Sequence, residues 1–199
     1  MHHAERPLTL YYAPGSSSMA THIALVESGL PFEAHPISLA RLEQRSSAFL
    51  DLNPEGKVPV LKVGERVLTE VAATLFYVAH RAPQAGLWPF DDLLAQARVV
   101  SWMSFCASTL HPARRQDSES IQAVFRLAER RLAGNQWAVD HYSIADIHLF
   151  RLFLRMRRSI APILDTLPGL KRHFQTILSR SAVREVMAVE SREGYQFPI

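Results

Sequence analysis

Cysteine is nearly absent from this sequence, because Cys106 is the only one in 199 residues. The chain therefore cannot form an internal disulfide, which favours a reducing compartment, and we expect a cytoplasmic location. No run of about 18 uninterrupted apolar residues occurs, so we expect no membrane-spanning helix and no membrane partner. The first residues also lack the apolar stretch behind a basic start that marks a secretion signal. These absences predict a cytoplasmic globular protein.

A strong charge of either sign is missing too. The sequence holds 22 Lys and Arg against 19 Asp and Glu, which gives a net charge of +3. The basic residues lie in short groups spread along the chain, and aromatic residues do not interleave with them as in single-strand-binding proteins. We therefore expect no nucleic-acid partner, whereas a mildly anionic ligand fits the weak positive charge. The length and the 48% hydrophobic content suit two small domains with real cores.

Residues 1–84 predict an α/β domain. Short apolar segments at 8–12, 32–37, 58–63 and 66–69 indicate strands, and helical spacing of apolar residues occurs at 19–28, 39–50 and 70–82. Gly29 is placed to end the first helix, and Gly64-Glu65 is placed to form a hairpin. The element order is therefore β-α-β-α-β-β-α, an α/β layer with one parallel βαβ unit and a terminal hairpin.

Residues 91–199 predict an all-helical domain, joined to the first by a linker at 83–90. One long helix is expected at 91–115, followed by helices at 118–133, 167–181 and 182–190. Ser143 and Asp146 have the spacing of a capping box at the start of another helix. Cys106 lies in an apolar stretch of the long helix, and we expect it to be a small buried core residue.

Four motifs in order along nearly the whole chain resemble the bacterial glutathione S-transferases, most closely the beta class. The motifs are YYAPGSSS at 11–18, NPEGKVPVL at 53–61, LTE at 68–70 and YSIAD at 142–146. The resemblance implies a thioredoxin-like, glutathione-binding domain at 1–84 and a helical, substrate-binding domain at 91–199. It also implies a homodimer, glutathione as co-substrate and no metal.

The serines at 16–18 are the candidate catalytic residues that this resemblance implies. Glutathione reacts as a thiolate, which the start of a helix and a donating hydroxyl both stabilise. The beta-class cysteine corresponds to Ser17, whereas the catalytic serine of the delta-like classes corresponds to Ser16, so both are candidates. Ser18 matches a further polar residue that contacts glutathione. Because serine cannot form a mixed disulfide, hydroxyl-assisted thiolate chemistry is favoured. The structural alternative is that these serines only cap the following helix.

Other positions would bind the glutathione backbone and its γ-glutamyl end. The resemblance implies a cis bond between Val58 and Pro59, which leaves the Val58 backbone to pair with the cysteinyl residue of glutathione. Glu70 would meet the γ-glutamyl amino group. Val71 stands where the family usually has serine or glycine, so it offers a backbone N–H but no hydroxyl. The alternative for Glu70 is a first-turn acid that interacts with the helix dipole.

Two basic residues complete the predicted site. Lys57 would reach the glycyl carboxylate of glutathione, or would be a solvated surface residue. His111 corresponds to a histidine that the beta class places near the active-site cleft, where it would bind glutathione. The alternative for His111 is a partner of a helix C-terminus.

The function implied by the resemblance is conjugation of glutathione to small apolar electrophiles, a reaction typical of detoxification. Two other functions stay open on the same fold, because fold does not fix function. One is a non-catalytic binding or interaction protein, which the valine at position 71 and the missing beta-class cysteine would suit. The other is a glutathione-dependent isomerase or peroxidase.

Overall fold

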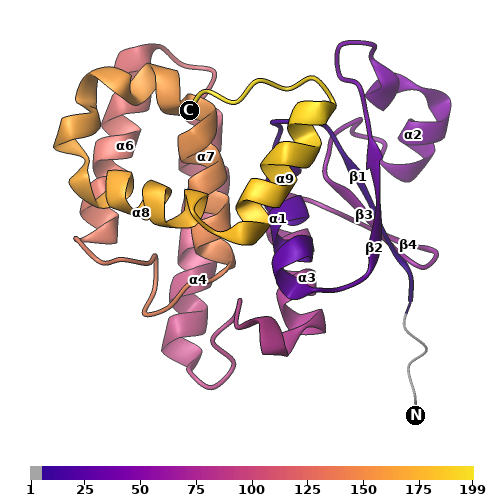
Figure 1. Ribbon diagram of the computed structural model, residues 1–199, viewed down its shortest axis with the longest axis horizontal. Coiled ribbons are helices and arrows are strands. Elements are labelled where there is room, and N and C mark those ends of the chain that lie inside the picture. The colour runs from indigo at the N-terminus through magenta and orange to yellow at the C-terminus, as the bar shows by residue number, and fades with distance from the viewer. Residues whose placement is uncertain (1–5) are drawn as a thin grey trace. The chain divides into compact units, whose positions relative to one another are not determined.

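The computed structural model describes residues 6–199 and divides the chain into two units (Figure 1). The first unit contains the residues up to Ala85 together with Val186–Gln196, and the second contains Gly86–Glu185 with Phe197–Ile199. The break after Ala85 falls inside the predicted linker at 83–90. Val186–Gln196, which lie inside the predicted helical domain at 91–199, cluster with the first unit.

The first unit is built on a four-stranded sheet in the order β2-β1-β3-β4. The strands are β1 (Leu8–Tyr12), β2 (Phe32–Pro36), β3 (Val60–Val63) and β4 (Arg66–Thr69). Strands β1 and β2 are parallel and the other two pairings are antiparallel, so the predicted βαβ unit and hairpin are confirmed. Strand β3 begins two residues later than predicted, because Pro59 has no N–H for the ladder.

Helices cover both faces of this sheet (Figure 1). They are α1 (Met19–Ser28), α2 (Ser47–Leu52) and α3 (Val71–Arg81), with 3₁₀ turns η1 (Glu43–Arg45) and η2 (Pro83–Ala85). Helices α1 and α3 pack together on one face, and α2 buries Phe49 with Val58 and Val60 on the other. The predicted helix at 39–50 is instead a 3₁₀ turn followed by α2. The Ser46 side chain caps α2 by accepting from the Phe49 N–H, so the helix starts there.

The second unit is helical, as predicted. Its elements are α4 (Leu93–Phe105), η3 (Cys106–Leu110), α5 (His111–Ala113), α6 (Ser118–Leu132), α7 (Ile144–Ile160), η4 (Ala161–Thr166) and α8 (Pro168–Leu178). Helix α9 (Ser181–Arg192) begins in this unit and ends in the first. The predicted long helix at 91–115 is continuous, but η3 is a π-helical turn within it.

Two details of the second unit confirm the sequence patterns. The capping box is formed, because the Ser143 N–H donates to Asp146 and the Ser143 side chain accepts at the start of α7. Cys106 is fully buried, as expected of a core residue. Within residues 6–199, no helix combines the length and apolar character needed to cross a membrane.

Candidate functional site

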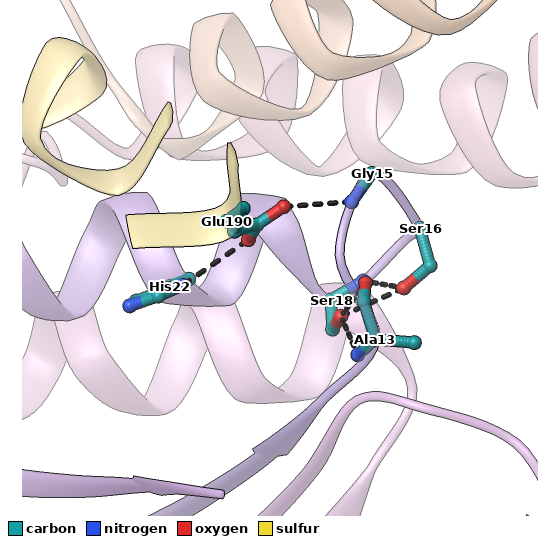
Figure 2. A network of polar contacts seen from close by, with 6 residues as sticks. All are labelled: Ala13, Gly15, Ser16, Ser18, His22 and Glu190. Carbon is teal, nitrogen blue, oxygen red and sulfur yellow. Dashed lines mark hydrogen bonds and ion pairs between the residues drawn. The ribbon is translucent and has the colours of Figure 1, made fainter. Parts of the chain in front are cut away.

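The loop between β1 and α1 carries the three candidate serines. The hydroxyls of two of them, Ser16 and Ser18, make hydrogen bonds within the loop (Figure 2). The buried Ser18 Oγ accepts from the Ala13 N–H at 3.0 Å and donates to the Ala13 carbonyl at 3.2 Å. Ser16 Oγ lies 2.7 Å from Ser18 Oγ. Either hydroxyl can donate in this bond. The Ser16 hydroxyl is therefore engaged inside the loop.

The serine hydroxyls do not cap α1 in the way that the structural alternative required. Ser18 stands at the N-cap position, but its side chain makes no capping hydrogen bond. Ser16 Oγ instead accepts from the Ser18 N–H at 3.2 Å, one position before the helix. The first-turn N–H groups of Met19 and Ala20 instead donate to the backbone carbonyls of Ser16 and Ser17, at 3.3 and 3.4 Å.

Ser17 is oriented differently from its two neighbours. Its partly exposed hydroxyl donates to the Val58 carbonyl at 2.7 Å, across a separation of 41 residues. The Val58–Pro59 bond is cis, as predicted. The Val58 N–H makes no hydrogen bond with another described residue outside the sheet ladder. The structure therefore brings Ser17 and the predicted glutathione-binding backbone of Val58 together.

A buried carboxylate from α9 holds the same loop. Glu190 is fully buried; one of its oxygens accepts from the Gly15 N–H at 2.7 Å, and the other lies 3.1 Å from Nδ1 of buried His22 (Figure 2). Sequence reasoning missed both residues. A signal was present, because Glu190 continues the helical spacing of the buried Val183, Val186 and Met187. A charged residue in such an apolar stripe indicates a buried polar contact.

Gly15 fits closely against the segment that follows α9. Its φ angle is +69°, and a Cβ added there would clash with the Tyr195 ring. Both facts require glycine at this position.

Beside the loop, a cleft of about 340 Å³ is lined by Pro14, Arg41 and Tyr195 among others. Burial, helped by Glu193 and Glu190, raises the pKa of nearby Tyr12 to about 12. Tyr12 is thus neutral at physiological pH.

The remaining predicted residues of the first unit lie at the start of α3 and on the loop before β3. Glu70 is the N-cap residue of α3, is exposed, and adopts φ 67° and ψ 131°. This conformation is strained for a residue with a side chain, and such strain is concentrated at functional sites. Val71 is the buried first residue of α3. The Lys57 ammonium is exposed and pairs with Glu55.

His111 lies in the second unit, immediately after the π-helical turn. Its Nε2 accepts from Arg114 Nε at 3.0 Å, and its Nδ1 lies 3.2 Å from a terminal nitrogen of Arg151. The predicted residues thus fall into two groups, one in each unit. Among the residues that the structure describes, no three His, Cys, Asp or Glu side chains are placed to hold a metal ion.

Comparison with known proteins gives full-length similarity. The family models described as glutathione S-transferase N-terminal and C-terminal domains match residues 6–80 and 89–181. A glutathione S-transferase of Xanthomonas campestris pv. campestris is 32% identical, over 92% of this chain and 98% of its own. A maleylacetoacetate isomerase of Pseudomonas aeruginosa is 31% identical over 87% of this chain and 92% of its own. A sphingomonad glutathione S-transferase, solved in complex with glutathione, has 32% identity and a TM-score of 0.82, over 92% and 98% of the two chains.

Proposed function

Because the chain belongs to the glutathione S-transferase family, we propose that it is an enzyme that joins the glutathione thiolate to small apolar electrophiles. Glutathione is the co-substrate. The observation that carries the catalytic assignment is the 2.7 Å hydrogen bond from Ser17 Oγ to the Val58 carbonyl. In the proposed complex the backbone of Val58 pairs with the cysteinyl residue of glutathione. The residue that bears the thiol therefore lies beside the Ser17 hydroxyl.

We assign thiolate stabilisation to Ser17 rather than to Ser16. The Ser17 hydroxyl needs only to rotate from the Val58 carbonyl toward the sulfur, where it donates a hydrogen bond to a negative charge. The Ser16 hydroxyl is bonded to the Ser18 hydroxyl and to the Ser18 N–H, and the Ser18 hydroxyl is bonded to the backbone of Ala13, so both are engaged inside the loop. In our proposal Ser16 and Ser18 shape the loop and border the bound tripeptide.

The rest of the tripeptide is held by residues already described. Val58 supplies an N–H and a carbonyl, and Pro59 directs the chain away so that these groups face the ligand. Glu70 meets the γ-glutamyl amino group, while the N–H groups at Val71 and after it meet the γ-glutamyl carboxylate. Lys57 leaves its ion pair with Glu55 and binds the glycyl carboxylate of glutathione. His111 is a further proposed glutathione-binding residue.

The cellular role that we propose is detoxification of electrophiles in the cytoplasm. The buried, unpaired Cys106 and the use of reduced glutathione both suit a reducing compartment. Separation of cell extract into soluble, membrane and secreted fractions tests the location. Recovery of the protein outside the soluble fraction would contradict it.

We also propose a homodimer. Leu93, Leu94 and Val100 of α4 expose 80%, 71% and 54% of their surface, which is unusual for three apolar residues on one helix. Burial against a second copy removes this surface from water. Light scattering at micromolar concentration is expected to give twice the chain mass, and the double variant L93E/L94E is expected to be monomeric. A monomeric wild type would refute the dimer.

A glutathione-dependent isomerase is the second candidate function. It is favoured by the similarity to the maleylacetoacetate isomerase, which covers 87% of the chain. The same Ser17-stabilised thiolate would serve both reactions. Product analysis separates them, because conjugation consumes glutathione whereas isomerisation returns it.

The central experiment measures turnover with a chromogenic chlorodinitrobenzene and the ultraviolet absorption of enzyme-bound thiolate. A hydrogen bond to a charged group contributes about 1.5–3 kcal/mol, so Ser17→Ala should lower kcat/KM about 10- to 150-fold. It should also raise the pKa of the bound thiol. Ser16→Ala should have a smaller effect on both.

Ser47→Ala is the matched control, because Ser47 is exposed at the start of α2. Lack of glutathione binding by calorimetry at millimolar concentration would sink the proposed function. A larger loss in Ser16→Ala than in Ser17→Ala would reverse the catalytic assignment.

A further inference from the structure

Arg151 is a buried cation at the centre of the helical unit. It lies on α7, is 2% exposed, and its one hydrogen bond within the described residues joins a terminal nitrogen to His111 Nδ1. Its Nε is buried and has no hydrogen-bond partner. Buried guanidinium groups are normally paired with carboxylates, because removing a charge from water is otherwise strongly unfavourable.

The described neighbours of Arg151 supply no negative charge. Within residues 6–199, no carboxylate lies within ion-pair distance of Arg151 or Arg114. The cations Arg155 and Arg114 lower the pKa of Arg151 beyond the effect of burial. Burial raises the pKa of the Cys106 thiol to about 12, so this neighbour is not a thiolate at physiological pH. Burial also keeps His148 neutral, by lowering its pKa well below the usual value.

His111 cannot serve as the acceptor for both guanidinium groups that contact it. Arg114 Nε donates to His111 Nε2 at 3.0 Å, and Arg151 approaches Nδ1 at 3.2 Å. A neutral imidazole accepts at one ring nitrogen and donates from the other, and a protonated one accepts at neither. In these two contacts, N–H donors therefore outnumber acceptors in every protonation state of the ring.

We propose that Arg151, His111 and Arg114 form a binding site for a carboxylate, and that this carboxylate belongs to the second substrate. The proposal rests on the proposed function and adds a substrate class to it, namely electrophiles that bear an acid group. Two N–H donors of a guanidinium match the two oxygens of a carboxylate. A bound carboxylate supplies the acceptors that the cluster lacks and the charge that Arg151 needs.

The local backbone supports this assignment. The π-helical turn η3 ends at Leu110, directly before His111, and π-helical turns occur frequently at functional sites because they shift the side chains that follow. Arg114 is exposed and His111 is half-buried, whereas Arg151, which contacts His111, is buried. The two more accessible side chains therefore offer an anion its first contacts.

The test compares two electrophiles of the same shape, a chloronitrobenzoate and the matching chloronitrobenzamide. Wild-type kcat/KM, corrected for the uncatalysed rates, is expected to be about 10- to 150-fold higher for the benzoate, as for one charge-assisted hydrogen bond. This ratio is expected to fall toward 1 in Arg151→Met and in Arg114→Gln. Arg158→Gln, an exposed change on the same helix, should keep the ratio. Because Arg114 is exposed, Arg114→Gln keeps the proposal testable even if the buried variant Arg151→Met does not fold.

Three outcomes would overturn the proposal. The first is an equal wild-type kcat/KM for the two electrophiles. The second is a ratio that survives both variants. The third is a rise in KM for glutathione in the variants with the ratio intact, which would assign the carboxylate to glutathione.

A second readout separates this proposal from the proposed function. Calorimetry with nitrobenzoate and nitrobenzamide as non-reactive probes needs no turnover. If neither electrophile is turned over, the proposed function fails. The carboxylate site stands in that case if nitrobenzoate binds more tightly than nitrobenzamide and Arg151→Met abolishes the difference. It falls if the two probes bind alike.

Discussion

Replacing Arg151 by methionine should stabilise the protein when no carboxylate ligand is present. Burial is the main cause that lowers the pKa of Arg151, to about 10. The folded state thus binds this proton less tightly than the unfolded state does, and the penalty is fully present below pH 10. At about 1.4 kcal/mol per pKa unit, the buried charge destabilises the fold by about 3 kcal/mol at neutral pH. This penalty is relieved only as the pH rises from 10 toward the ordinary pKa of a guanidinium group.

Methionine removes this charge and fills similar space with apolar atoms. The hydrogen bond to His111 is lost as well, which takes back about 1 kcal/mol. The net gain is then about 2 kcal/mol in the free energy of unfolding, or roughly 4–8 °C in Tm for a chain of this length. Urea and thermal unfolding at pH 7, in a buffer of chloride alone, measure both quantities.

The exposed Arg158→Met serves as the reference, with an expected change within about 0.5 kcal/mol. Nitrobenzoate at about 100 times its Kd should raise the unfolding free energy of the wild type by about 2.7 kcal/mol and leave Arg151→Met unchanged. A loss of more than about 1 kcal/mol in Arg151→Met without ligand would refute the reasoning. Arg151 would then be a stabilising structural residue.

Three further predictions concern the serine loop and the single cysteine. Glu190→Ala leaves the Gly15 N–H and His22 Nδ1 without their buried partner, and each unsatisfied group costs about 1–3 kcal/mol, so denaturant titration should show a loss of about 2–6 kcal/mol; an unchanged midpoint would contradict these contacts. Gly15→Ala should destabilise by at least about 1 kcal/mol through its positive φ and its clash with the Tyr195 ring, and Tyr195→Ala should relieve part of that loss in the double variant. Because Cys106 is buried with its thiol pKa raised to about 12, an aromatic disulfide reagent at pH 8 should react with it only on unfolding; rapid labelling of the folded protein would argue against this.

Much of the fold could be predicted because its elements are marked by local patterns. The apolar segment at β1, the glycine after α1 and the Ser143–Asp146 capping box each act within a few residues of their own position. The π-helical turn η3 was missed, because a change from i+4 to i+5 hydrogen bonding leaves no mark in the spacing of apolar residues. The late start of α2 depended on Ser46, which a broad window of apolar spacing does not resolve.

The candidate site was predictable in outline but not in its hydrogen bonds. Ser16 and Ser17 are adjacent in the sequence, after a glycine and before a helix. The local pattern therefore cannot decide which of the two is the catalytic residue. Their difference arises from distant partners, since Ser17 donates to Val58 on a separate loop. The same holds for His111, whose contact with Arg151 joins residues 40 positions apart. Such pairings depend on tertiary packing, and a single sequence carries only the residue types.

The bond between Gly15 and Glu190 also has a consequence for how the protein is made. Glu190 is synthesised 175 residues after Gly15, and residues 86–185 of the helical unit lie between them in the sequence. At a typical elongation rate of about 5–20 residues per second, roughly 9 to 35 seconds pass between the synthesis of Gly15 and the synthesis of Glu190. During that interval the nascent glutathione-binding half has its strands but not its finished loop. A fragment that stops at the linker would therefore lack the carboxylate to which the Gly15 N–H donates.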